Sequence, residues 1–173
     1  MYPLLGRLHF AAAILALVTG AWVLLRPKGG RLHRRVGWSY VASMLALNAT
    51  ALVIYRLTGT FGPFHVAALV SGGTLVAGVL PAWRRRPRGK WIEHHYFFMT
   101  YSYLGLVAAA VAETATRVPA IQSIAGGPTP AFWITVVVAS MSVFLVGGRM
   151  IRARVRSTLA PFKRPGGVAA VEP

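Results

Sequence analysis

The stretch LHFAAAILALVTGAWVLL, from Leu8 to Leu25, decides the fold class. It contains no Lys, Arg, Asp or Glu along its whole length. An α-helix rises about 1.5 Å per residue, so about 20 apolar residues cross the ~30 Å hydrocarbon core of a bilayer. The stretch therefore predicts a transmembrane helix rather than a helix of a water-soluble domain.

Four later segments have similar length and apolar character. The five predicted spans are residues 8–25, 36–55, 64–83, 95–112 and 131–151. Hydrophobic residues make up 55% of the 173-residue chain and charged residues only 13%, which is too little charge to cover a soluble domain. We predict an all-α, polytopic transmembrane bundle in residues 1–151, with a four-helix core plus a fifth helix. Residues 152–173 are expected to form a basic, disordered cytoplasmic tail.

The charged residues predict the orientation of the bundle. The formal net charge is +16, and sixteen of the 19 Lys and Arg residues lie in three clusters between or after the spans. These clusters occupy residues 26–35, 84–90 and 149–164. All three fall on one side of a five-span chain, so the positive-inside rule places the N-terminus outside and the C-terminus in the cytoplasm of a bacterial inner membrane. The expected partners are the lipid bilayer and anionic headgroups at the cytoplasmic loops, not nucleic acid.

The composition also excludes several kinds of site. The chain has no cysteine, which excludes disulfides, thiolate metal sites, iron–sulfur clusters and c-type haem attachment. It has no Asp, and its three acidic residues are all Glu, so the carboxylate pair of most hydrolases is missing. No catalytic set is predicted.

The histidines are the chemically versatile residues near the helix ends. In a sequential four-helix bundle, the first and third helices lie on one diagonal, and the second and fourth on the other. His9 would then face His65 near the outer surface, and His33 would face His95 near the inner one. Two imidazoles on opposite helices are the axial ligands that a haem between them requires. We therefore hypothesise a b-type haem electron carrier, with all four histidines as iron ligands.

Two alternatives remain open from the residues. In the first, the histidines are interfacial groups that reach water or headgroups, and the chain is a non-enzymatic scaffold, assembly factor or small permeation protein. In the second, another metal is held at the inner side by Glu93, His94 and His33. A structural metal site usually requires three or four ligands.

Two motifs resemble a known family. His33-Arg34-Arg35-Val36-Gly37 and His95-Tyr96-Phe97-Phe98-Met99-Thr100-Tyr101-Ser102-Tyr103 are similar to the His-Arg-x-x-Gly and His-x-x-x-Met-x-x-Ser-Tyr patterns of a bacterial membrane-protein family, domain of unknown function 2306. The resemblance covers roughly residues 5–118 and implies a small polytopic membrane protein. It departs after His95, where the family tends to carry Arg and this chain has Tyr96, Phe97 and Thr100. The layout of the histidines is also similar to that of the cytochrome b561 superfamily, which implies paired histidines that hold two haems.

Overall fold

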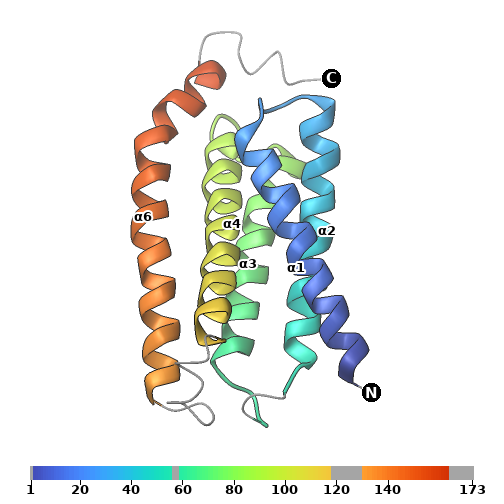
Figure 1. The fold of residues 1–173 in the computed structure, drawn as a ribbon. Helices are drawn as coiled ribbons and strands as arrows, with labels where there is room; N and C mark the ends of the chain where they lie inside the picture. Colours follow the sequence, from blue (N-terminus) through green and yellow to red (C-terminus); the bar gives the residue numbers. More distant parts are fainter. Residues whose placement is uncertain (1, 56–58, 118–129, 164–173) are drawn as a thin grey trace.

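The chain forms five long helices and no sheet in the part that the structure describes. The computed structural model describes residues 2–55, 59–117 and 130–163 (Figure 1). The helices are α1 (Tyr2–Leu25), α2 (Arg31–Val53), α3 (Pro63–Arg84), α4 (Trp91–Thr116) and α6 (Pro130–Lys163). Each is long and apolar enough to cross a membrane. The prediction of an all-α bundle with five spans is confirmed.

Most helices are longer than the predicted spans because their polar ends also adopt helical structure. The largest difference is in α6, which runs to Lys163 rather than ending near Ile151. Residues 152–160 contain Arg, Ala and Leu, which favour helix, and neither Gly nor Pro. The prolines and glycines from Pro161 onward indicated a disordered tail, but Pro161 itself lies inside the helix. Residues 164–173 of the predicted tail lie outside the described residues.

Helices α1 to α4 form a square bundle. The pairs α1–α2, α2–α3, α3–α4 and α1–α4 pack against each other. Within the described ranges, α1 makes no close backbone contact with α3, and α2 makes none with α4, so these pairs are the diagonals. Figure 1 shows α6 standing outside this square beside α4, which is the helix it packs against. We call the end where α1 and α3 finish and α2 and α4 begin the basic end, because it carries the clusters at 26–35 and 84–90.

The core is a small cluster in the middle of the square. It consists of Ala16, Tyr40, Val41, Met44, Leu75 and Leu106, all buried. By contrast, large apolar side chains on the outer faces of the helices are exposed; Phe10, for example, is 66% exposed. A surface of this kind is unfavourable in water and suits a hydrocarbon solvent.

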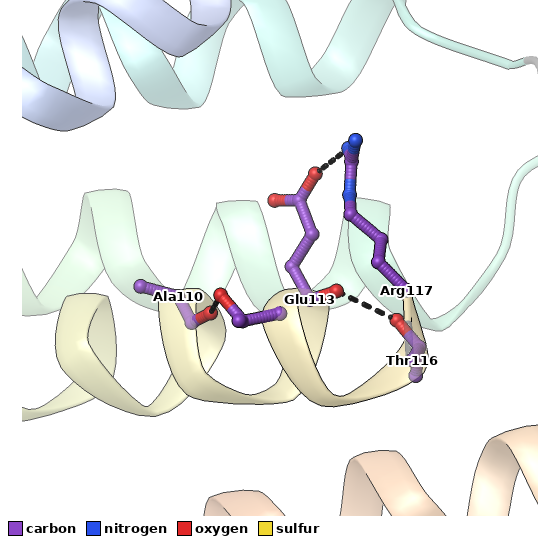
Figure 2. A network of polar contacts seen from close by, with 5 residues as sticks. Ala110, Glu113, Thr116 and Arg117 are labelled. Carbon is purple, nitrogen blue, oxygen red and sulfur yellow. Dashed lines mark hydrogen bonds and ion pairs between the residues drawn. The ribbon is translucent and has the colours of Figure 1, made fainter. Parts of the chain in front are cut away.

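The end of α4 away from the basic end is closed by local polar contacts. Figure 2 shows the carboxylate of Glu113 paired with the guanidinium of Arg117, one turn later on the same helix. The hydroxyl of Thr116 donates a hydrogen bond to the Glu113 carbonyl at 2.9 Å. These bonds satisfy groups that the end of a helix would otherwise leave open. The pair is exposed, so it contributes little to stability.

Candidate functional site

The basic end brings two histidines face to face across the bundle. His33 lies in the first turn of α2, and His95 lies in the second turn of α4 on the diagonally opposite helix. Their ring centroids are 6.4 Å apart, and the ring planes are inclined at 79°. His95 shares the core-facing side of α4 with Ser102 and Leu106, which are buried and spaced at helical intervals from it.

The proton of the His95 ring can be assigned from its hydrogen bond. Nδ1 of His95 lies 2.8 Å from the carbonyl oxygen of Gly78 on α3. A carbonyl can only accept, so Nδ1 carries the proton, and Nε2 of the neutral ring keeps a lone pair. This is the arrangement found in metal-ligating histidines, whose other nitrogen donates to a carbonyl or carboxylate.

His33 is held differently. Its Nδ1 is buried and has no hydrogen-bond partner. The ring therefore lacks the acceptor that fixes the orientation of His95. If both rings bind one ligand, we expect His33 to be the weaker of the two.

A layer of hydroxyl groups lies two helical turns below the histidine pair. The Tyr40 hydroxyl and the Ser102 hydroxyl are 3.0 Å apart and buried, and they again join α2 to α4 across the diagonal. Tyr103 donates to the carbonyl of Leu17 on α1 at 3.2 Å. A Cβ at Gly20 would collide with the rings of Tyr40 and Tyr103, so only glycine lets α1 approach this layer. The layer forms a packed floor below the site.

Between the floor and the histidines there is room at Gly37. Gly37 lies one turn after His33 on α2, on the side between the directions of Tyr40 and Val41. A Cβ built there would meet no atom within 4 Å. The Cβ position of Gly37 is therefore open, one turn below His33.

The loop between α1 and α2 places a partly buried cation near the pair. The ammonium of Lys28 donates hydrogen bonds to the carbonyls of Leu24 at 2.6 Å and Arg26 at 2.7 Å, which completes the end of α1. Burial lowers the pKa of Lys28 because the charged form loses hydration. The surroundings of the histidine pair are cationic and attract anionic groups.

At the opposite end, His9 is bonded within the bundle rather than to His65. Its Nδ1 lies 2.9 Å from the hydroxyl oxygen of Thr50 on α2. That hydroxyl already donates to the Ala46 carbonyl at 2.8 Å, so its oxygen accepts a hydrogen bond from the Nδ1–H of His9. The helices that carry His9 and His65, α1 and α3, make no close backbone contact within the described ranges.

His65 has its ring proton on the nitrogen that an iron ligand would use. The backbone N–H of Gly62 donates to Nδ1 of His65 at 3.1 Å, so the neutral ring carries its proton on Nε2. That Nε2 is buried without a partner, and the ring lies against those of Tyr55 and Phe61, with centroids 4.4 Å and 5.0 Å away. The outer haem at His9 and His65 stays a prediction, and this hydrogen bond argues against it.

The alternative of another metal at the inner side lacks a ligand set. Nδ1 of His94 lies 2.9 Å from the Lys90 carbonyl of its own helix, away from the core-facing side that holds His95. Over residues 2–55, 59–117 and 130–163, no group of three or more His, Cys, Asp or Glu side chains could hold a metal ion. The facing pair of His33 and His95 is therefore the feature on which a ligand site at this end can be proposed.

Comparison with known proteins identifies the family. A family model described as "Predicted membrane protein (DUF2306)" matches residues 6–151. The chain belongs to the DUF2306 family. No curated protein and no solved structure matches it. The DUF2306 match covers all four bundle helices and the membrane-spanning part of α6, and it ends where the arginine-rich continuation of α6 begins.

The two motifs that carry the family resemblance meet at this site. The first supplies His33 and Gly37, and the second supplies His95, Ser102 and Tyr103. These residues form the facing rings, the open space and the floor. In this DUF2306 chain the motif residues are therefore structural neighbours, although the motifs are far apart in sequence.

Three residues of the site, Gly78, Tyr40 and Gly37, were not predicted from the sequence. A signal for Tyr40 was present, because Tyr40 follows His33 by the same interval by which Ser102 follows His95. Two turns of helix separate the residues of each pair, so Tyr40 lies on the same face of α2 as His33, and Ser102 lies on the same face of α4 as His95. The sequence could not predict that the Gly78 carbonyl bonds His95, because every residue type supplies a backbone carbonyl at that position.

Proposed function

We propose that this multi-pass membrane protein binds one b-type haem at its basic end, with His33 and His95 as the axial ligands, and carries electrons. The observation that carries the proposal is the pair of facing imidazoles, one of which is fixed by Gly78 with its Nε2 lone pair free. Of the two haems predicted from the sequence, we retain the inner one, held by His33 and His95.

The separation of the rings supports the proposal. A bond between a metal and an imidazole nitrogen is about 2 Å long, so two imidazoles that share one metal have ring centroids roughly 6 Å apart. The observed 6.4 Å is close to that value. Two protein ligands are too few for a structural zinc site and sufficient for haem iron.

The space around the rings also supports a flat ligand. The open side of Gly37 leaves room below His33. The hydrogen bond between Tyr40 and Ser102 brings α2 and α4 together at the next level, which limits the site to the basic end. The cationic loops there suit a ligand with carboxylate side groups.

When bound, haem supplies one-electron chemistry that none of the side chains present can supply. The chain's own residues have simpler tasks. The Gly78 carbonyl holds the His95 ring in one tautomer. The packed floor of Tyr40 and Ser102 separates the site from the rest of the core. The placement of the basic clusters supports a site at the cytoplasmic side of a bacterial inner membrane, with the C-terminus on that side.

A visible spectrum of the purified protein tests the proposal. The full chain is expressed with added haem precursor, purified in detergent, and measured oxidised and reduced. We expect a Soret band that shifts on reduction, together with the sharp α and β bands of a low-spin haem with two histidine ligands. A colourless protein that is folded by circular dichroism would overturn the proposal and favour a membrane scaffold with interfacial histidines.

A further inference from the structure

Helix α6 continues past its membrane-spanning part along the basic end of the bundle. A Cβ at Gly147 would collide with Leu104, and one at Gly148 would lie 3.9 Å from the Tyr101 hydroxyl, so these residues fix the register between α6 and α4. The two helices are antiparallel, so eleven residues after Gly148 on α6 corresponds to eleven residues before Tyr101 on α4, which is roughly 16 Å at 1.5 Å per residue. Leu159 therefore lies at the level of Lys90, where α4 begins. The continuation thus runs beside the polar first turns of α4.

One side of this continuation packs against the rest of the protein. Ile151 is 7% exposed and Leu159 is 4% exposed, although most of α6 is open. Phe162 shares their side of the helix, and its ring lies 3.8 Å from where a Cβ of Gly29 would be, in the loop between α1 and α2. Figure 1 shows this end of α6 leaning toward the end of α1. The segment is therefore a packed part of the fold.

A second edge of the same segment carries a row of arginines. Arg149, Arg152 and Arg156 are exposed and follow at intervals of three and four residues, which places them on one flank. Like charges at this spacing repel each other, and α6 contains no acidic residue. Anionic groups outside the helix would relieve this repulsion.

We propose that this arginine row binds the phosphate groups of anionic phospholipids. By this register Arg156 lies at the level of Glu93, where α4 becomes polar and a headgroup layer is expected. Arg152 and Arg149 lie one and two turns deeper, from where their long side chains can extend toward the headgroups. Arginine forms paired hydrogen bonds with phosphate, and basic segments beside a membrane span attract anionic lipid. The apolar edge of Ile151, Leu159 and Phe162 holds the row in place, so lipid is bound by an ordered surface. The proposal does not depend on haem.

Native mass spectrometry of the full chain tests the inference. The detergent-purified protein is mixed with phosphatidylglycerol or with phosphatidylcholine, and the bound lipids are counted. We expect phosphatidylglycerol to bind the unmodified protein in preference to phosphatidylcholine. The triple variant Arg149→Gln, Arg152→Gln and Arg156→Gln should bind phosphatidylglycerol roughly tenfold or more weakly, because each arginine adds to the attraction.

A matched control removes the same charge elsewhere at the basic end. The variant Arg84→Gln, Arg86→Gln and Arg88→Gln should keep most of the phosphatidylglycerol binding. Equal loss in both variants would overturn the proposal, because net charge alone would then explain binding. Unchanged binding in the α6 variant would overturn it too and would direct the search to an acidic protein partner. Circular dichroism checks that both variants fold, and the haem spectrum of the unmodified chain tests the proposed function separately.

Discussion

His95→Ala is expected to abolish the haem spectrum of the purified protein, and His94→Ala is expected to leave it intact. The two residues are neighbours in sequence, but His95 faces the core and is bonded to Gly78, whereas His94 is bonded to the carbonyl of Lys90 on its own helix. Removing His95 takes away the better-oriented ligand together with its fixed tautomer. The measurement is the Soret absorbance per mole of folded protein.

The companion variant His33→Ala should also remove the six-coordinate spectrum, and it should leave more residual haem than His95→Ala does. The reason is that Nδ1 of His33 has no hydrogen-bond partner, so its ring is less well oriented. An unchanged spectrum in His95→Ala, or equal losses in His94→Ala and His95→Ala, would contradict the assignment of the ligands.

Gly37→Phe is expected to reduce haem content at least tenfold without unfolding the protein. Gly37 provides the open space below His33, and a phenyl ring there would occupy the volume that a flat ligand requires. A Cβ at this position meets no atom within 4 Å, so the first atom of the new side chain makes no clash, and the melting temperature of the variant checks that the ring is accommodated. It therefore separates loss of ligand from the cost of overpacking a filled core, which is typically about 1–3 kcal/mol.

Gly73→Phe is the matched control for Gly37→Phe. Gly73 is an exposed helical glycine, and a Cβ at this position also meets no atom within 4 Å. We expect the control to keep the haem content and melting temperature of the unmodified protein. Full haem content in Gly37→Phe would show that the space below His33 does not belong to the site.

The spans and their pairing could be predicted because both follow from simple constraints. Length and hydropathy set the spans, since lipid cannot satisfy open backbone groups. Short connections make consecutive helices neighbours, which leaves α1–α3 and α2–α4 as diagonals. These two rules, applied to the sequence alone, are sufficient to place His33 opposite His95, and the two rings do face each other.

The protonation of the rings could not be predicted from these rules, because it depends on single hydrogen bonds. The Gly78 carbonyl that fixes His95 belongs to the backbone of another helix and has no sequence signature. For His65 a signature did exist. Gly62-Pro63 is typical of a helix start, and the side chain of the third helical residue, here His65, can accept the N–H of the capping residue. This hydrogen bond from Gly62 to Nδ1 places the proton of the His65 ring on Nε2, the nitrogen that would otherwise bind haem iron.

The helical continuation of α6 differs from the predicted tail for a related reason. The prolines and glycines from Pro161 onward indicated a disordered tail, but Ile151 and Leu159 recur at helical spacing and are buried. Alternation of charge with a sparse apolar stripe is typical of a helix at an interface, and this pattern is visible in the sequence.

The most direct test of the account is the number of haems per chain. Haem extracted from the purified, haem-replete protein is assayed as its pyridine complex and divided by the protein concentration from amino-acid analysis, for the unmodified chain and for His65→Ala. The account predicts one haem b per chain in both. Two haems in the unmodified chain that fall to one in His65→Ala would restore the outer site and contradict the assignment of the His65 proton, and no haem in either would contradict the site at His33 and His95.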